Sequence, residues 1–565
     1  MSGIAMGAPG EARDAASDLL IAGSGVAGLV AAITARCCGL NPVIVEKSDK
    51  WGGTSAMSGG SLWIPGHHLM AENGVDEDMA EAAAYLAAHA SQGGAPSSPE
   101  RQAAFLQTGP EMVRFLADLG FEWDFSPFPD YYPEAEGASY GRGVNAKLFD
   151  GAALGAWRKS MRAMVRIPAV VVKPHEFKSM LMPTRDLRAM RNGLTVALRT
   201  AWWRLRGKSP MFIGQALTGR LMEIALKLGV DVRLNSAIVD LLHEGGRVVG
   251  AVVESGGVRR ELRAKAGVVL ASGGFARNDA LRRSHQAVAG SYTVAVPEDT
   301  GDALTAAIKL GAATALMDDA WWGASVLFPD GSRSFLLWER TLPHSLIVDR
   351  TGRRYVNEAA PYNDLGRVMV ERSRIYPADP SFLIMDARHR RRYVFANLLG
   401  GYNPSKLIRS GFLIKAATID ELAAKCGIDT ATLKETLQRF NRFAKTGKDH
   451  DFGRGDSLFD RIYGDDAVGP NPCLGAVEQA PFWAVRIHPG DLGTKGGLLT
   501  NSDGQVLDMA RLPIAGLYAS GNTTASVMGR GYPGPGSTLG PAAVFAYRAA
   551  RHAGGTLNAD VGSEL

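Results

Sequence analysis

The sequence predicts an α/β fold in which a discontinuous Rossmann-like nucleotide-binding domain carries an inserted α+β domain. Three observations lead to this prediction. A glycine-rich strand–turn–helix–strand pattern opens the chain, and glycine-rich segments return after residue 490. A length of 565 residues also exceeds one ordinary domain. We expect a disordered lead-in over 1–17, the nucleotide-binding domain over 18–297 and 490–565, and the inserted domain over 298–489.

The opening pattern is a βαβ unit around a G-x-G-x-x-G motif. Gly23, Gly25 and Gly28 have the motif spacing, which serves a tight turn, the close approach of a pyrophosphate and close helix packing. The following helix would direct its N-terminal N–H groups at the phosphates. Glu46 lies 18 residues after Gly28, where an acid that binds ribose is expected. The predicted strand, helix and second strand cover 19–22, 26–38 and 42–45.

The next segment, KSDKWGGTSAMSGGS over 47–61, favours FAD over NAD. A glycine- and serine-rich loop after the ribose acid suits an extended FAD, because it offers backbone and hydroxyl donors. The alternative is an ordinary polar loop. The residues assigned to FAD are Gly23, Gly25, Val26, Ala27, Gly28, Glu46, Lys47, Gly53, Thr54, Ser55, Ser58, Gly59, Gly60 and Ser61, with Ala271, Gly273, Gly521, Asn522, Ser537 and Leu539 from the later glycine-rich segments.

Hydrophobic periodicity and capping residues place the remaining elements. Residues 121–143 are aromatic and interrupted by Pro and Gly, so we expect an irregular loop there. Predicted helices cover 76–90, 111–119, 214–228, 298–310, 419–426, 431–445 and 537–551. Predicted strands cover 230–234, 238–242, 248–254, 258–262, 267–270 and 517–519.

Cysteine usage and the chain ends indicate a cytoplasmic protein. The four cysteines show no metal-ligand spacing and no C-x-x-C pair, so we expect no metal site and no disulfide framework. The N-terminus lacks the pattern of a signal peptide, and no run of about 18 apolar residues exists.

The segment 154–210 departs from the rest of the chain in charge. It carries thirteen Lys or Arg and two acids, a net charge of +11, whereas the whole chain is at +5. Its Trp, Met and Val residues alternate with the basic ones, as in interfacial membrane segments. The competing interpretation is a solvated insertion that packs on its own protein. Nucleic-acid binding is disfavoured by the large apolar share.

Taken together, several motifs resemble the flavin-dependent 3-ketosteroid dehydrogenases, above all the Δ1-dehydrogenases, within the wider fumarate reductase and succinate dehydrogenase flavoprotein fold. They span residues 18 to 547. A His-bearing motif for covalent FAD is absent near Thr54 and Ser55, so the resemblance implies non-covalent FAD. The matching pieces are GSGVAG, EKSDKWGGTSAMSGGSLWIPG, FPDYY, AWWG, RRYVNEAAPYND, GDLGTKGGL, GLYASGNTTASVMG and YPGPGSTLGPA.

The resemblance also implies roles for a set of tyrosines. Dehydrogenation of the C1–C2 bond of a 3-ketosteroid removes a proton from C2 and a hydride from C1. In YPGPG, Tyr532 and the N–H of Gly536 would bind the C3 oxygen and stabilise the developing enolate. Tyr362 would take the C2 proton, assisted by Tyr131 in FPDYY. Tyr132 is the adjacent candidate for the assisting role.

The preferred substrates would include sterols that keep their side chain, such as cholest-4-en-3-one, with the basic segment docked on the inner face of the cell membrane and a quinone as electron acceptor. Three alternatives stay open: a dehydrogenase of the C4–C5 bond of 3-ketosteroids, a fumarate-reductase-like reductase of an unsaturated acid, and a membrane-associated sterol-binding protein with a vestigial flavin site.

Overall fold

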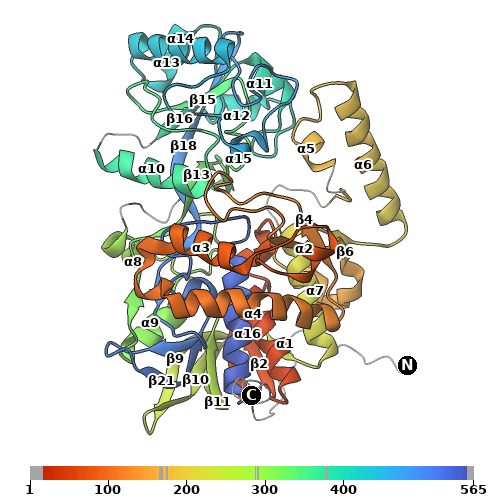
Figure 1. The fold of residues 1–565 in the computed structure, drawn as a ribbon, viewed down its shortest axis with the longest axis vertical. Helices are drawn as coiled ribbons and strands as arrows, with labels where there is room; N and C mark the ends of the chain where they lie inside the picture. The colour runs from red at the N-terminus through yellow and green to blue at the C-terminus, as the bar shows by residue number, and fades with distance from the viewer. Residues whose placement is uncertain are drawn as a thin grey trace.

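The computed structural model describes residues 17–163, 170–172, 176–286, 288, 292–375 and 380–555. Of the lead-in expected over 1–17, only Ser17 is described, as the first residue of a strand. Parts of the basic segment, 164–169 and 173–175, also lie outside the described residues. Figure 1 shows two bodies, one below and one above, and an arm at the side.

The lower body is built on an eight-stranded sheet, ordered β20-β21-β10-β11-β1-β2-β8, with β9 paired to β10. The 13-residue strand β11 pairs antiparallel with β10 in its first half and parallel with β1 and β21 in its second half. The bounds are Ser17–Ala22 (β1), Pro42–Val45 (β2), Asp231–Arg233 (β8), Ala237–Glu244 (β9), Arg247–Ser255 (β10), Val258–Leu270 (β11), Gln505–Leu507 (β20) and Pro513–Ala519 (β21).

Alternating side chains of β1 enter two different cores, as expected for a strand buried on both faces. Leu19 and Ile21 pack into a core with α1, α4, α7 and α16. Leu20 and Ala22 pack into a second core with α9. The helices are Val26–Cys37 (α1), Met79–Ala90 (α3), Pro99–Asp118 (α4), Ile213–Lys227 (α7), Asp279–His285 (α8), Asp302–Lys309 (α9) and Leu539–Ala553 (α16).

The upper body is an antiparallel sheet with helices, in the order β14-β13-β18-β16-β15, with β17 paired to β18. The long strand β18 runs from this body toward the lower one (Figure 1). Its strands are Ala320–Leu327 (β13), Arg333–Phe335 (β14), Ser345–Val348 (β15), Ser381–Met385 (β16), Ile414–Ala416 (β17) and Phe482–Thr494 (β18). Its helices are Tyr362–Ile375 (α10), Ala387–Arg392 (α11), Ser405–Arg409 (α12), Ile419–Cys426 (α13), Thr430–Thr446 (α14) and Leu458–Arg461 (α15).

The arm comes from the basic segment and contains α5 (Phe177–Met180) and α6 (Leu187–Leu205), which lies at the edge of the molecule (Figure 1). The smaller elements are β3 (Leu62–Trp63), β4 (Trp123–Ser126), β5 (Gly143–Ala146), β6 (Phe149–Asp150), β7 (Pro210–Met211), β12 (Thr314–Ala315), β19 (Gly497–Leu498), α2 (His68–Glu72) and several 3₁₀ turns. Among the described residues, no helix is both long and apolar enough to span a bilayer.

The α/β fold class is confirmed, and the differences from the sequence predictions are local. The segment 121–143 is not wholly irregular, because Trp123–Ser126 pairs with β5 as a strand. The strands expected over 258–262 and 267–270 are one continuous strand, β11. The helix expected over 111–119 begins at Pro99 and continues through Pro110. The domain limits stay a prediction, although α9 packs in the core of the lower body and favours a later start for the inserted domain.

Candidate functional site

The strand-to-helix turn of the βαβ unit has the shape that a pyrophosphate needs. Gly23 has a φ of +97°, and a Cβ at Gly28 would lie 1.9 Å from the Gly23 carbonyl oxygen, so both positions require glycine. A Cβ at Gly25 would meet only the Ser55 hydroxyl, at 3.2 Å. Gly25 caps α1 without a side-chain hydrogen bond, so this helix N-terminus, with Val26 and Ala27, can face an anion, although the Val26 N–H also donates to the Ser55 hydroxyl.

Glu46 lies beside this turn and is fixed by hydrogen bonds. Its carboxylate accepts from the Ser24 N–H at 3.1 Å, the Ser24 hydroxyl at 2.6 Å and the Ser48 N–H at 3.0 Å. Burial raises the pKa of Glu46, while these hydrogen bonds oppose that rise. Lys47 points elsewhere, since its ammonium contacts Asp302 at 2.6 Å. A held carboxylate at this place suits a ribose hydroxyl, and Lys47 is the weakest of the assignments to FAD.

The glycine- and serine-rich loop after Glu46 leaves room beside its backbone. A Cβ on Gly53 or Gly59 would meet no atom within 4 Å. Ser55 accepts the Val26 N–H at 3.2 Å, so the loop lies against the N-terminus of α1. The other assigned loop residues hold the loop itself: Thr54 accepts the Val296 N–H, the Ser58 hydroxyl donates to the Ser55 carbonyl and accepts the Gly60 N–H, and Ser61 donates to Asn145.

The later glycine-rich segments return to the same edge of the sheet. Ala271 continues β11 beside Ala22, and a Cβ at Gly273 would lie 2.5 Å from a carboxylate oxygen of Asp299. Gly521 and Asn522 line a cavity at the start of α16, where Asn522 accepts the Trp321 indole N–H at 3.0 Å. Ser537 holds both the N–H and the carbonyl of Gly534, and Leu539 is the first residue of α16.

Two buried polar atoms at this edge have no hydrogen-bond partner among the described residues, namely that Asp299 oxygen and Nε of Arg101. Arg101 lines the same cavity as Asn522, and burial lowers its pKa to about 10. Unsatisfied buried groups are costly, so both atoms favour a polar ligand in this place. The open helix N-terminus, the loop and these atoms together fit FAD.

The three tyrosines expected to act on the substrate come from distant segments and meet in the core. The ring centroids of Tyr131 and Tyr532 are 5.3 Å apart, those of Tyr362 and Tyr532 are 4.9 Å apart, and those of Tyr131 and Tyr362 are 6.0 Å apart. Tyr131 follows β4, Tyr362 is the first residue of α10, and Tyr532 precedes α16. All three side chains are less than a tenth exposed.

The hydroxyl of Tyr532 in the tyrosine cluster has hydrogen-bond donors beside it. The Thr538 hydroxyl donates to it at 3.5 Å, and the Tyr362 hydroxyl and the backbone N–H groups of Gly536 and Thr538 lie close enough to lower its pKa. Burial raises the pKa of Tyr532, and these donors oppose the rise. Burial also raises the pKa values of Tyr131 and Tyr362 well above the ordinary value. All three are therefore neutral near neutral pH, and the Gly536 N–H and Tyr532 hydroxyl lie beside each other.

The structure separates Tyr131 from its neighbour Tyr132. The Tyr132 hydroxyl donates to both carboxylate oxygens of Asp364 at 3.0 Å, and its ring stacks on His89. Tyr131, in contrast, contacts the rings of Tyr362 and Tyr532. The register that the sequence left open thus places Tyr131 in the tyrosine cluster, and its assisting role stays a prediction.

Gly536 cannot be replaced by another residue without movement of its surroundings. Its φ is +100°, and a Cβ there would lie 2.5 Å from the Ser61 carbonyl oxygen and 2.6 Å from the Trp63 nitrogen. The glycine therefore allows this backbone conformation beside Tyr532, whose pKa the Gly536 N–H lowers.

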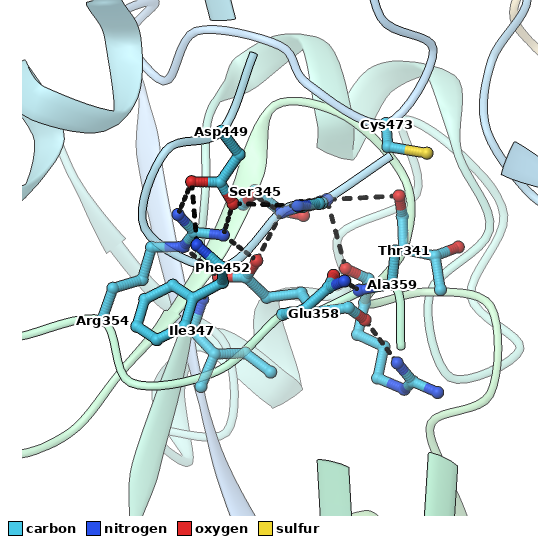
Figure 2. A network of polar contacts seen from close by, with 12 residues as sticks. Thr341, Ser345, Ile347, Arg354, Glu358, Ala359, Asp449, Phe452 and Cys473 are labelled. Carbon is cyan, nitrogen blue, oxygen red and sulfur yellow. Dashed lines mark hydrogen bonds and ion pairs between the residues drawn. The ribbon is translucent and has the colours of Figure 1, made fainter. Parts of the chain in front are cut away.

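A buried ionic network holds the loop that leads into Tyr362, and Figure 2 shows Arg354 between Glu358 and Asp449. The Glu358 carboxylate also contacts Arg454 at 3.1 Å and accepts the Ile347 N–H at 3.0 Å. Burial would raise the pKa of Glu358, but Arg354 and Arg454 lower it overall. The network fixes position 358, four residues before Tyr362.

Replacing Glu358 by Gln should destabilise the protein by about 3–5 kcal/mol, because the buried Arg454 would lose its charged partner. Chemical denaturation measures this difference. Since the pKa of Glu358 is lowered in the fold, its stabilisation should be present above pH about 4.3 and be lost as the pH falls further. An exposed pair, Lys434 with Asp420, is the control, and its loss should change little. Equal losses for both variants would contradict the prediction.

The sequence did not identify two buried cations near the tyrosines. Arg340 donates to the carbonyl oxygens of Glu358 and Ala360, and its charge opposes the rise in the pKa of Tyr131. Lys495 lies in the TKGGL segment beside the residues that flank Tyr362 and Tyr532. No local signal marks either residue, because their partners are distant in the chain.

Comparison with known proteins gives the family. The family described as FAD binding domain matches residues 18–539. The 3-oxosteroid 1-dehydrogenase of Mycobacterium tuberculosis (strain ATCC 25618 / H37Rv) is 41% identical over 95% of this chain and 98% of its own. The 4-oxocyclohexanecarboxylate 2-dehydrogenase of Sinomonas cyclohexanicum is 36% identical over 94% and 92%.

A solved structure agrees with these relatives. The 3-ketosteroid Δ1-dehydrogenase of Sterolibacterium denitrificans, in complex with 1,4-androstadiene-3,17-dione, matches with a TM-score of 0.90 at 36% identity, over 96% of this chain and all of the other. FAD is confirmed as the cofactor. The chain belongs to the FAD binding domain family and, as its motifs predicted, to the group of flavoproteins that contains the 3-oxosteroid 1-dehydrogenases.

Proposed function

We propose that this protein removes hydrogen from C1 and C2 of 3-ketosteroids. The observation that carries the proposal is the convergence of Tyr131, Tyr362 and Tyr532 beside residues that fit FAD. The 3-oxosteroid 1-dehydrogenase and Δ1-dehydrogenase relatives, similar over nearly the whole chain, support the same reaction.

The residues divide the reaction among themselves. Tyr532 and the Gly536 N–H bind the C3 oxygen and stabilise the negative charge that grows there as the C2 proton leaves. Tyr362 takes that proton, and Tyr131, packed against it, assists. Bound FAD, which we propose is held non-covalently, supplies the acceptor for the hydride that leaves C1. One proton and one hydride leave the steroid, and a C1–C2 double bond forms.

Anaerobic mixing of the purified protein with steroids tests the proposal. Both cholest-4-en-3-one and androst-4-ene-3,17-dione should bleach the flavin, and a 1,4-diene product should form. Neither substrate has a C4–C5 single bond, so bleaching excludes the C4–C5 reaction as the explanation. Bleaching by 4-oxocyclohexanecarboxylate alone would instead show a small cyclic ketone as the substrate and would overturn the steroid proposal.

We further propose that the substrates include sterols with a side chain, taken from a membrane surface on which α6 docks. One stripe of α6 exposes large apolar side chains at helical spacing, and each is at least half exposed: Leu187, Met190, Leu194, Leu198, Trp202 and Leu205. The basic side chains of Arg188 and Arg191 are exposed on the same helix. An apolar stripe with flanking cations suits an anionic lipid surface.

Replacing Leu194 and Leu198 by Gln should weaken binding to vesicles that contain anionic lipid by at least about tenfold, because two buried leucines would be lost from the bilayer contact. Co-sedimentation with anionic and zwitterionic vesicles measures this. The matched control replaces Leu458 and Leu512, which are equally exposed outside α6, and should bind normally. Unchanged binding of the α6 variant would contradict the proposal, as would a dimer in solution that buries this stripe.

The proposed electron acceptor is a quinone, and the proposed place is the inner face of the cell membrane. The sequence shows one dinucleotide-binding motif, and we assign it to FAD. No second motif of this kind is left to bind a nicotinamide acceptor. Reoxidation of the reduced protein by a soluble quinone but not by NAD⁺ would support this choice, and the reverse would contradict it.

A further inference from the structure

Lys495 is a fully buried lysine that lies just beyond the end of β18. Among the described residues, its ammonium has no carboxylate within hydrogen-bond distance, and the carboxylate of Asp319 lies 3.9 Å away. Charged groups that face it come from three segments: Asp319, Asp364, Arg367 and Arg530. A buried ammonium with this little compensation is costly, and burial lowers the pKa of Lys495 to about 8.

The ammonium instead holds the loop that carries Tyr532. It donates to the carbonyl oxygens of Arg530 at 2.9 Å and Gly531 at 3.1 Å, the two residues before that tyrosine. The same loop is joined to the next tyrosine segment, because the Tyr131 N–H donates to the Pro533 carbonyl at 2.9 Å. Lys495 therefore helps to fix the loop that sets the position of Tyr532.

Lys495 also reaches the start of α10, which carries Tyr362. It donates to the side-chain oxygen of Asn363 at 3.3 Å, and Asn363 in turn donates to the Arg530 carbonyl at 3.4 Å. Its charge opposes the rise in the pKa of Asp364, the partner of Tyr132. One ammonium thus contacts the residue after Tyr362 and the two residues before Tyr532.

The ammonium also lies over the ring of Trp321, 4.5 Å from its centre. Trp321 packs edge-on against Tyr532 and donates to Asn522, which we assign to FAD. The same cation therefore contacts Trp321, the side chain that links the tyrosine cluster to the residues assigned to FAD.

We infer that Lys495 is a positioning residue that sets Tyr362 and Tyr532 relative to each other and to the flavin. The inference rests on the function proposed above. A misplacement of about 1 Å at a reacting group can cost about 10²-fold in rate, so loss of this contact should appear in the chemical step.

Three variants test the inference in the FAD-bound protein. Lys495→Met should lower the single-turnover rate of flavin bleaching by androst-4-ene-3,17-dione about 10²-fold per bound FAD, at saturating steroid. Lys495→Arg, which keeps the charge and the donors, should recover part of that rate. Asn363→Ser, a milder change, should slow bleaching several-fold. Its combination with Lys495→Met should slow bleaching by less than the product of the two single effects, because the two variants share the contact between Lys495 and Asn363.

The matched control is Arg282→Met, which also removes a fully buried cation, one that pairs with Asp491 and lies over Trp322. It should lower the melting temperature but leave the rate per bound FAD unchanged. A Lys495→Met rate equal to that of this control would overturn the inference, as would additive effects of Lys495→Met and Asn363→Ser. If Tyr362→Phe bleaches normally while Lys495→Met is slow, the proposed roles of the tyrosines fail instead.

Discussion

Replacing Tyr362 by Phe should slow flavin bleaching by a 3-ketosteroid by about 10²–10⁴-fold, the usual contribution of a general base. The ring and its packing against Phe335 and Tyr532 would remain, since only the hydroxyl is lost. We therefore expect FAD content and steroid binding close to those of the unchanged protein. Anaerobic stopped-flow absorbance measures the rate, and titration with 1,4-androstadiene-3,17-dione measures binding.

The pH dependence gives this prediction a second test. Burial raises the pKa of Tyr362 above its ordinary value of about 10, so the resting side chain is neutral. Only the tyrosinate can take a proton from C2. Below its pKa, the tyrosinate fraction grows about tenfold with each pH unit, so the bleaching rate should rise with pH across the neutral range. The Tyr362→Phe variant should lose this rise.

A matched control for this variant is Tyr355→Phe. Tyr355 is also a buried tyrosine of the upper body, and its hydroxyl bonds Ser381 at 2.7 Å. Removing that hydroxyl should leave the bleaching rate unchanged. A fast Tyr362→Phe enzyme would mean that another group takes the C2 proton, and the next candidate would be the Tyr131 hydroxyl.

The parts of the fold that the sequence predicted are those with local signals. The G-x-G-x-x-G spacing, the apolar run before it and the acid after it all lie within about 30 residues, the size of one βαβ unit. The helix over 419–426 was predicted to the residue, because Thr418 caps its start and Gly427 ends it in a left-handed conformation. Capping depends on neighbours in the chain, so it can be read without the fold.

Other elements depend on partners that the sequence does not show. Trp123–Ser126 is a strand because β5 pairs with it. Trp123 and Phe125 suit a strand, but Asp124 and the Pro and Gly residues that follow hid the pattern in the sequence. The helix predicted over 111–119 is the end of a longer one, because α4 begins at Pro99 and continues through Pro110. The sequence showed that basic and apolar residues alternate in this segment. That one apolar stripe of α6 is exposed becomes visible only in the fold, where no described element covers that face.

The same division applies to the site. Tyr362 and Tyr532 could be assigned through motifs, but the choice between Tyr131 and Tyr132 needed the orientation of each ring. Lys495 and Arg340 could not be assigned, since most of the backbone carbonyl groups that they contact are 18 or more residues away. Every residue has a backbone carbonyl group, so a contact to one does not select a particular residue type and gives no signal in the sequence.

Replacing Tyr532 by Phe should slow bleaching by about 10²–10³-fold, the usual cost of losing one donor to a developing oxyanion. Burial raises the pKa of Tyr532, so its hydroxyl stays protonated and can donate to the C3 oxygen at neutral pH. The Thr538 hydroxyl donates to that hydroxyl at 3.5 Å, and the Tyr532 ring is buried against Tyr131 and Tyr362, so the side chain is held in place before the steroid arrives. Its loss would leave the Gly536 N–H as the remaining proposed donor to the oxygen.

A steroid with a phenolic A ring separates this role from that of Tyr362, because its phenolate resembles the enolate. The wild-type protein should lower the pKa of the bound phenol. The ultraviolet absorbance of the bound steroid measures this pKa, because phenol and phenolate absorb differently. Tyr532→Phe should abolish that shift, whereas Tyr362→Phe should leave much of it, since the donors to the C3 oxygen remain. Tyr518→Phe, at a buried tyrosine that bonds His552, is the control. An intact shift in Tyr532→Phe would show that the C3 oxygen binds elsewhere in the cluster.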